Sequence, residues 1–248
     1  MDRDRYSAIA HRGMPIWNPI GLDSLLALTA RCGLAEDRRV LDVGCGRAEL
    51  LLSLIEQHGV VAVGVEPSPR ATEVALAEAD ARDPGARLHL QVAAFDASLF
   101  APASFDLVAC LGATHACGSF ADTLAALAPL ARPGGHLLIG EGYWRRKPDQ
   151  EYLAFLGCTE EELTPLEGFA AAGEAQGLAM VAQAASSDEE WDAYEGGYEA
   201  NMRAHLADHP DDPDAEAFRE RMESWSEALR RWGRTTLGFA ATLYRRGP

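Results

Sequence analysis

Short apolar runs alternate along the chain with helical patterns. Five runs are predicted to be strands, at residues 40–43, 60–65, 88–92, 105–111 and 136–139. Helical spacing of apolar residues follows three of them, at residues 48–55, 70–81 and 120–131. The second run is almost wholly apolar, as is typical of a strand buried on both faces of a parallel sheet. This alternation predicts βαβ crossovers and a doubly wound, mostly parallel sheet.

The segments that flank this core are less regular. Residues 1–20 contain Pro15 and Pro19, so we expect no continuous helix there, and a helix is predicted from Gly21 to Cys32. The later pattern predicts helices near 152–156 and 166–176, a strand at 178–184, two amphipathic helices within 186–233 and a closing strand at 235–244. We therefore expect one α/β domain over residues 1–248, with a seven-stranded sheet, helices on both faces and a helical insertion before the last strand.

Charge and cysteine content narrow the possible partners. Lys and Arg number 22 against 38 Asp and Glu, and the formal net charge is −16, so nucleic acid is not an expected partner. No run approaches the roughly 18 apolar residues of a membrane span, and the charged N-terminus has no apolar signal core. The five cysteines form no C-x-x-C pair, which indicates neither a disulfide framework nor a metal site. We expect a cytoplasmic monomer or homodimer.

The stretch VLDVGCGRAELLLSL, at residues 40–54, carries the first chemical signal. A predicted strand is followed by a turn with Gly44 and Gly46 and then by a helix. In this order the backbone of the turn can approach a nucleotide-like ligand closely, with the helix N-terminus pointing at it. A dinucleotide fingerprint would place a third glycine where this chain has Glu49, whose charge would repel a pyrophosphate. The ligand implied is a nucleoside without phosphates, and an NAD-dependent oxidoreductase is the disfavoured alternative.

At Asp42, Gly44, Gly46 and Ala48, with Cys45 between the glycines, the chain resembles class I S-adenosylmethionine-dependent methyltransferases, whose first motif runs D-x-G-x-G-x-[GA]. Together with the stretches 17–19, 111–120 and 140–144, this is similar to the bacterial YjhP-type branch. The resemblance implies S-adenosyl-L-methionine as cofactor, S-adenosyl-L-homocysteine as product and a small-molecule acceptor. A non-catalytic sensor or scaffold that binds the same nucleoside is a further alternative. The single domain would then comprise an N-terminal segment and helix at 1–36, a cofactor-binding core at 38–140 and acceptor-side or lid elements with the last strands at 141–248.

Acidic residues near strand ends extend the predicted cofactor site. The carboxylate of Glu66 can accept from both ribose hydroxyls, although an acid stabilised at a helix N-terminus is the alternative. Asp42 is costly inside an apolar strand unless it is paired, and the resemblance implies that it orients the glycine turn or reaches the ligand's ammonium through water. The resemblance places Asp96 at the adenine amino group, whereas a strand-end Asp is also a common turn former or helix cap. The predicted cofactor-binding residues are Asp42, Gly44, Cys45, Gly46, Glu66, Pro67, Phe95, Asp96, Ala97 and Leu111.

The loops after the fourth and fifth strands are predicted to carry the acceptor side, because ligands of open α/β sheets bind at the carboxyl edge. The candidate catalytic residues are His115, Glu141 and Tyr143, and the candidate acceptor pocket comprises Trp17, Asn18, His115, Tyr143 and Trp144. A general base is needed only for an acceptor that is protonated at neutral pH. For His115 the alternative is a surface or structural role, and for the aromatics it is core packing. The aromatic stripes of the two late helices are assigned to the core, with a lid over the acceptor as the alternative.

Overall fold

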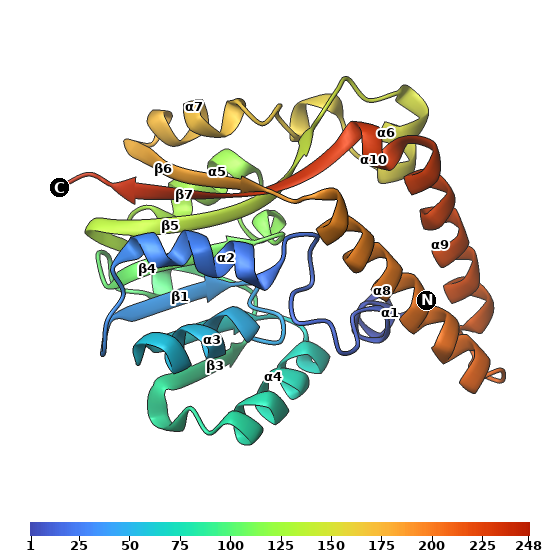
Figure 1. Ribbon diagram of the computed structural model, residues 1–248, viewed down its shortest axis with the longest axis horizontal. Helices are drawn as coiled ribbons and strands as arrows, with labels where there is room; N and C mark the ends of the chain where they lie inside the picture. Colours follow the sequence, from blue (N-terminus) through green and yellow to red (C-terminus); the bar gives the residue numbers. More distant parts are fainter.

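A seven-stranded sheet in the order β3-β2-β1-β4-β5-β7-β6 forms the centre of the computed structural model, which describes residues 1–248 (Figure 1). Its strands are β1 (Arg39–Val43), β2 (Val61–Glu66), β3 (Leu88–Val92), β4 (Phe105–Leu111), β5 (Ala131–Trp144), β6 (Leu178–Ala185) and β7 (Leu237–Arg246). The first five pair in parallel, whereas β7 is antiparallel to both of its neighbours. The sheet is therefore mixed: it is mostly parallel, as the alternation predicts, and β7 is the one strand that runs opposite to the others.

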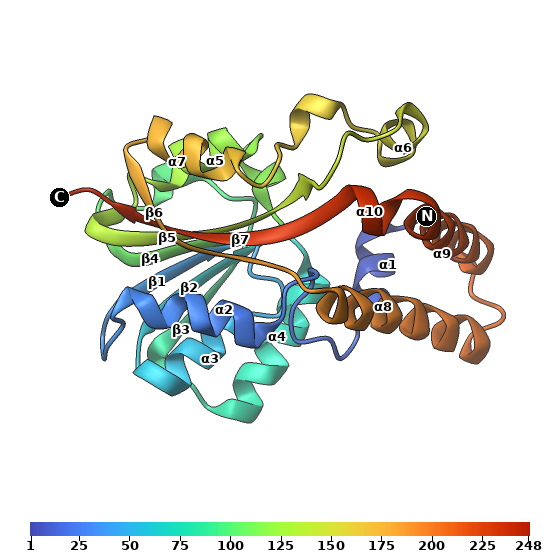
Figure 2. The ribbon, with the colours of Figure 1, turned by 45° about the horizontal axis from the view of Figure 1, so that its top comes forward.

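The direction of β7 follows from the helices that precede it. β6 ends at the same edge of the sheet as the parallel strands, and the chain then forms α8 (Asp188–Asp208) and α9 (Ala215–Ala228) beyond that edge (Figures 1 and 2). These helices do not cross a face of the sheet, so the chain re-enters at the edge it left. A strand that starts there runs opposite to its neighbours, and the predicted helical insertion before the last strand is confirmed.

Helices cover both faces of the sheet, as Figure 2 shows. On one face lie α2 (Leu22–Thr29), α3 (Glu49–His58) and α4 (Pro69–Arg82), and on the other lie α5 (Phe120–Leu127) and α7 (Gly168–Ala175). Two short helices, α6 (Gln150–Leu156) and α10 (Arg234–Thr236), lie near the start of β7. Helix α5 ends at Leu127, four residues before the predicted end at residue 131. Residue 131 is instead the first residue of β5.

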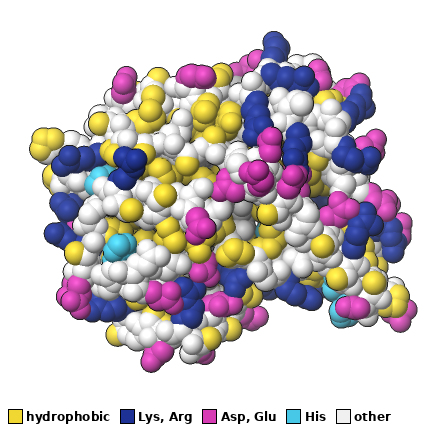
Figure 3. Space-filling view, in the orientation of Figure 1, with side chains coloured by type: hydrophobic (Ala, Val, Ile, Leu, Met, Phe, Trp, Pro, Cys, Tyr) yellow, Lys and Arg dark blue, Asp and Glu magenta, His cyan; other side chains and the backbone are white.

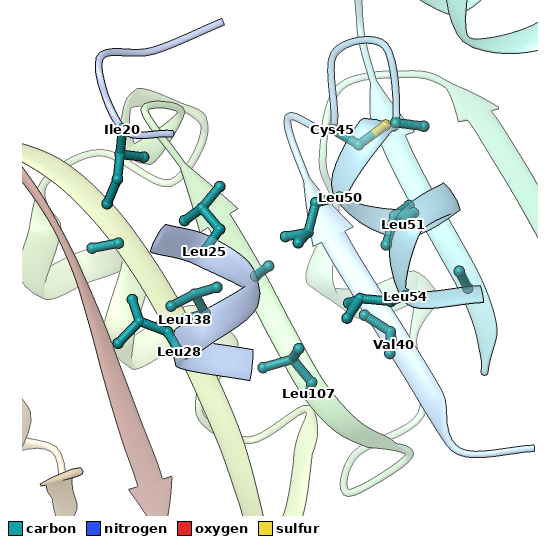
Figure 4. Close-up of a cluster of buried hydrophobic side chains, with 14 of the residues drawn as sticks. Ile20, Leu25, Leu28, Val40, Cys45, Leu50, Leu51, Leu54, Leu107 and Leu138 are labelled. Carbon is teal, nitrogen blue, oxygen red and sulfur yellow. The ribbon is translucent and has the colours of Figure 1, made fainter. Parts of the chain in front are cut away.

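Alternate residues of the central strands bury in two separate cores. Val40, Leu107 and Leu138 pack with leucines of α2 and α3, including Leu25 and Leu54 (Figure 4). Their neighbours in sequence face the helices on the opposite side of the sheet and are Leu41, Val108 and Leu137. This two-residue period is the one that strand geometry imposes, and it explains why these runs are apolar throughout.

Residues 3–10 form a helix, α1 (Arg3–Ala10), in a region where we expected irregular chain. The carboxylate of Asp2 caps it by accepting from the Arg5 N–H at 3.0 Å. Both prolines lie after the end of the helix, so they do not oppose it. A helix this short depends on tertiary packing, and its apolar face is buried in a cluster formed by Tyr6, Ile9, Ala10, Met202, Phe218 and Met222.

The surface seen in Figure 3 intersperses acidic and basic side chains. Arg231, for example, lies 2.6 Å from the carboxylate of Glu151. None of the helices combines the length and the apolar character needed to cross a lipid bilayer.

Candidate active site

The glycine turn after β1 has a backbone that favours glycine. Gly44 has φ +73° and Gly46 has φ +53°. A Cβ added at Gly44 would lie 2.3 Å from Cβ of Ala113, which is far inside van der Waals contact. Ala48 also has a positive φ, +61°, at the residue that precedes α3. The turn therefore keeps a bare, tightly packed backbone at the carboxyl edge of the sheet.

Glu66, the last residue of β2, holds this turn in place. Its Oε2 accepts from the Gly46 N–H and its Oε1 accepts from the Ser68 N–H, both at 2.9 Å. Ser68 is the cap of α4, so the carboxylate also lies at a helix N-terminus, as the alternative interpretation expected. Each carboxylate oxygen has a further lone pair, which leaves Glu66 able to accept from two ligand hydroxyls.

Asp42 is buried beneath the turn. Only 3% of its surface is exposed, and its Oδ1 has no hydrogen-bond partner. Burial, with a contribution from the charge of Glu66, raises the pKa of Asp42 to about 7. A cationic ligand group within reach would stabilise the ionised form, because an unpaired buried carboxylate is costly. Cys45 packs towards Gly64, and burial raises the pKa of its thiol, so it fills space and is not activated as a nucleophile.

A cavity of about 410 Å³ opens next to the turn. This cofactor cavity is lined by the predicted residues Gly44, Gly46, Glu66, Pro67, Phe95, Leu111, Trp17 and His115, and also by Asp4, Ser7, His11, Val43, Val65, Ser68, Ala94, Gly112, Ala113 and Ala116. Its volume is in the range of small-molecule sites. No Lys or Arg lines it, and two carboxylates do, which suits a cationic nucleoside and opposes a pyrophosphate.

Three wall residues of the cofactor cavity come from α1 and the residue that follows it, a segment for which no role was predicted. The Asp4 carboxylate accepts from the Ser68 hydroxyl and, at 3.0 Å, from Arg70. The ring of His11 stacks on Trp17 with centroids 4.9 Å apart. A capping Asp2 followed by apolar residues at helical spacing is the sequence signal that could have located this helix.

Four of the predicted cofactor residues are not walls of the cofactor cavity: Asp42 and Cys45, which lie beneath the turn, and Asp96 and Ala97. Asp96 is exposed, and its Oδ1 accepts from the Ser98 N–H at 2.9 Å, so it caps the short turn that follows. The structure thus shows the capping role that was one of the two considered. Phe95 remains the predicted adenine neighbour that does line the cavity.

A second cavity, of about 550 Å³, adjoins the first. The two share Trp17, Gly112 and His115 as wall residues. The other walls of this acceptor cavity are Asn18, Pro19, Thr114, Gly118, Ser119, Phe120, Glu141, Gly142, Leu156, Cys158, Glu162, Leu163, Trp191, Tyr194, Trp225, Leu237, Gly238 and Phe239. Of the predicted acceptor and catalytic residues, the structure brings together Trp17, Asn18, His115 and Glu141.

Glu141 is held by two donors, one in the 3₁₀ turn after β4 and one within β5. The Thr114 hydroxyl donates to its Oε2, and the Gly142 N–H donates to its Oε1 at 2.6 Å. His115, next to Thr114, is exposed in a short 3₁₀ turn and borders both cavities. Asn18 donates to the Leu111 carbonyl at 3.5 Å, which joins the N-terminal segment to the loop after β4.

Tyr143 and Trp144, predicted in the acceptor pocket, lie outside it. Both belong to β5, which extends five residues beyond the predicted strand. Tyr143 is 7% exposed and packs edge-on against Phe169 in the core. The indole N–H of Trp144 donates to the Glu160 carbonyl at 2.8 Å, away from the cavity. Core packing, the alternative for these aromatics, is what the structure shows.

The aromatic residues of α8 and α9 divide between the two interpretations given to them. Trp191, Tyr194 and Trp225 line the acceptor cavity, whereas Tyr198 and Phe218 pack against Tyr6 of α1. The two helices therefore cover the cavity with one part of their length and hold α1 with another.

Comparisons with known proteins agree with this geometry. A family model described as a methyltransferase domain matches residues 41–137. The chain is 32% identical to the protein YjhP of Escherichia coli over 86% of each chain. A methyltransferase from Geobacter sulfurreducens, solved with S-adenosyl-L-homocysteine, is 28% identical, with a TM-score of 0.89 and 97% of each chain covered. One from Thiobacillus denitrificans, solved with the same ligand, is 29% identical, with a TM-score of 0.88 over 98% of this chain and 99% of that chain.

Proposed function

The chain belongs to the class I S-adenosylmethionine-dependent methyltransferases of the YjhP type, and we propose that its methyl acceptor is a small molecule held in the acceptor cavity. Its cofactor is S-adenosyl-L-methionine. The observation that carries the proposal is that the cofactor and acceptor cavities adjoin at Trp17, Gly112 and His115. Methyl transfer requires the donor and acceptor atoms to be in contact. Two adjacent cavities that share lining residues allow this contact.

The proposed cofactor contacts follow from the donors and acceptors around the turn. Glu66 accepts from the ribose hydroxyls, Phe95 lies against the adenine, and the bare backbone of Gly44 and Gly46 admits the ligand closely. The unpartnered oxygen of Asp42 faces the ligand's ammonium, directly or through water. When bound, S-adenosyl-L-methionine supplies a methyl group on a positively charged sulfur, which is a good leaving group.

The remaining work of the chain is positioning and exclusion of water. Trp17 and the aromatic residues of α8 and α9 enclose the acceptor, and His115 and Glu141 are the groups that can orient it or take its proton. Tyr143 and Trp144 are not part of this proposed site, because Tyr143 packs against Phe169 and the Trp144 indole donates to the Glu160 carbonyl.

The partner and compartment assignments remain proposals. The net charge of −16 supports a small molecule over nucleic acid, and five free cysteines support a reducing compartment such as the cytoplasm.

Isothermal calorimetry with S-adenosyl-L-homocysteine tests the cofactor site, and we expect a micromolar dissociation constant. Failure to bind, or competition by NADH at similar concentration, would contradict the assignment. Incubation with S-adenosyl-L-methionine and a panel of small metabolites, read by mass spectrometry for a mass gain of one methylene, then identifies the acceptor. Methylation of a nucleic acid in preference to any small molecule would overturn the acceptor proposal.

A further inference from the structure

The acceptor cavity contains negative charge without positive charge. Glu141 and Glu162 line it, whereas no Lys or Arg does. A substrate carrying a carboxylate or phosphate would meet two like charges and no cation to offset them. A substrate carrying a cation would meet two counter-ions.

The rest of the cavity wall is dominated by aromatic rings. These come from the N-terminal segment, α5, α8, α9 and β7, and are Trp17, Phe120, Trp191, Tyr194, Trp225 and Phe239. Aromatic faces bind apolar groups and also attract cations through their ring quadrupoles. The walls therefore suit an apolar body attached to a cationic group.

Trp191 gives independent evidence that the cavity is built for a ligand. Its side chain is more than nine-tenths buried, with 7% exposed, and it lines the cavity. Its indole N–H has no hydrogen-bond partner. A buried donor without a partner is costly, and an oxygen on the substrate body would satisfy it.

Glu141 is the carboxylate placed for the transfer itself. The Thr114 hydroxyl and the Gly142 N–H fix its orientation and leave further lone pairs for a substrate. Thr114 directly precedes His115, which borders the cofactor cavity. A cationic group held at Glu141 therefore lies on the side of the acceptor cavity that faces the cofactor.

We propose that the methyl acceptor is an amine whose largely apolar body carries an oxygen, and that its nitrogen receives the methyl group. This inference rests on the proposed function of the acceptor cavity. Glu141 pairs with the ammonium nearest the cofactor, Glu162 supplements the negative field, and the aromatic walls hold the body.

The transfer step balances with the groups present. The bound ammonium gives a proton to the Glu141 carboxylate and becomes a neutral amine. The nitrogen lone pair then forms a bond to the methyl carbon while the carbon–sulfur bond breaks and its electron pair stays on sulfur. The products are a methylated ammonium ion and the neutral thioether, and the proton on Glu141 passes to water.

Three compounds that differ in one group test the substrate class. They are 2-(4-hydroxyphenyl)ethylamine, the corresponding alcohol and 3-(4-hydroxyphenyl)propanoate, each titrated into the protein saturated with S-adenosyl-L-homocysteine. We expect the amine to bind at least about tenfold more tightly than the other two, because only it pairs with the carboxylates. With S-adenosyl-L-methionine, fragmentation of the product should place the methyl group on nitrogen.

Charge-removing variants test whether Glu141 and Glu162 bind the amine, as distinct from an effect on folding or on cofactor binding. Glu141→Gln and Glu162→Gln should each weaken binding of the amine about tenfold and leave the affinity for S-adenosyl-L-homocysteine within about twofold. Gln retains the capping role that Glu162 has towards the Thr159 N–H. Glu161→Gln is the matched control, since Glu161 is an exposed neighbour outside the cavity.

The outcomes distinguish this inference from the function on which it rests. Equal binding of the three compounds, binding of none, methylation on the phenol oxygen, or unchanged amine affinity in both Gln variants overturns the amine assignment while binding of S-adenosyl-L-homocysteine persists. Failure of the wild-type protein to bind S-adenosyl-L-homocysteine overturns the proposed function itself.

Discussion

The backbone N–H of Gly46 donates a 2.9 Å hydrogen bond to the carboxylate of Glu66, which lies twenty residues later in the chain. The residue proposed to bind the ribose therefore also fixes the glycine turn. Its second oxygen does the same for Ser68 at the start of α4. One side chain thus sets the relative positions of the turn after β1 and the helix after β2, and its loss should affect binding more than a single ligand contact would.

Replacing Glu66 should impair cofactor binding directly. The amide of Glu66→Gln keeps one acceptor oxygen. Its NH₂ group replaces the other oxygen and cannot accept from the Gly46 or Ser68 N–H or from a ribose hydroxyl. Hydrogen bonds to charged groups contribute about 1.5–3 kcal/mol, so the affinity for S-adenosyl-L-homocysteine should fall about 10- to 100-fold. Calorimetry measures this, with Glu73→Gln on the exposed face of α4 as control. Equal affinities of the two variants would contradict the role of Glu66.

Gly44→Ala should destabilise the fold through two separate costs. Its φ of +73° disfavours any Cβ by about 1–2 kcal/mol. The clash with Ala113 should add about 1–3 kcal/mol of overpacking. Gly177→Ala is the matched control, because Gly177 has φ +70° but no atom within 4 Å of the added Cβ. Urea unfolding should show the larger loss for Gly44→Ala, and equal losses would show that close packing at the turn is unimportant.

His11 should make the fold sensitive to acid. Burial lowers the pKa of His11 from 6.5 to about 4, so the unfolded chain binds a proton that the folded chain does not. This contribution to stability is fully present above pH 6.5 and is lost as the pH falls towards 4, by up to about 3 kcal/mol. The raised pKa of Asp42, about 7 against 3.8, acts in the opposite direction across this whole range, so the wild-type curve alone is not diagnostic.

A variant without the imidazole isolates the His11 contribution. His11→Gln retains a polar partner for the Tyr194 hydroxyl, which lies 3.0 Å from Nε2 of His11. The difference in unfolding free energy between wild type and variant should shrink as the pH falls through this window. A difference that stays constant with pH would refute the assignment.

Asp212 should control how firmly α1 closes the cofactor cavity. Its carboxylate accepts from Arg5 of α1 and lies 2.8 Å from Nε2 of His205. Asp212→Asn should therefore speed amide hydrogen exchange in α1 about tenfold and release S-adenosyl-L-homocysteine faster. Asp211→Asn, at the adjacent exposed position, is the control. Unchanged exchange in α1 would show that other contacts hold the helix.

The alternating core could be predicted from sequence because its signal is local. Strands β3 and β4 begin and end at the predicted residues, 88–92 and 105–111. Strand β4 is buried and mostly apolar along its length, whereas β3 is an edge strand in which Leu88, Leu90 and Val92 alternate with polar residues. The direction of β7 could not be predicted in this way. It depends on where α8 and α9 return the chain, which no periodicity within the strand records.

The candidate site likewise contains residues that local sequence places and residues that distant contacts place. Gly44, Gly46 and Glu66 were predictable because the strand, turn and helix that place them are contiguous or one crossover apart. Tyr143 was misplaced because β5 continues through it and pairs it with Gly238, a partner nearly a hundred residues away. The role of His11 depends on its contacts with Trp17 and Tyr194, and the spacing of the residues around it does not reveal them.

The position of β7 between β5 and β6 determines the order in which the sheet can form during synthesis. Strand β6 leaves the ribosome before β7, the strand that joins it to the sheet. Its backbone groups therefore stay unpaired until about fifty further residues, which form α8, α9 and the start of β7, have been made. Helix α1, translated first, likewise waits for the partners in α8 and α9 that bury it. A nascent chain can therefore carry the whole glycine motif while α1, which forms one wall of the cofactor cavity, still lacks the residues that bury it, the last of which is Met222.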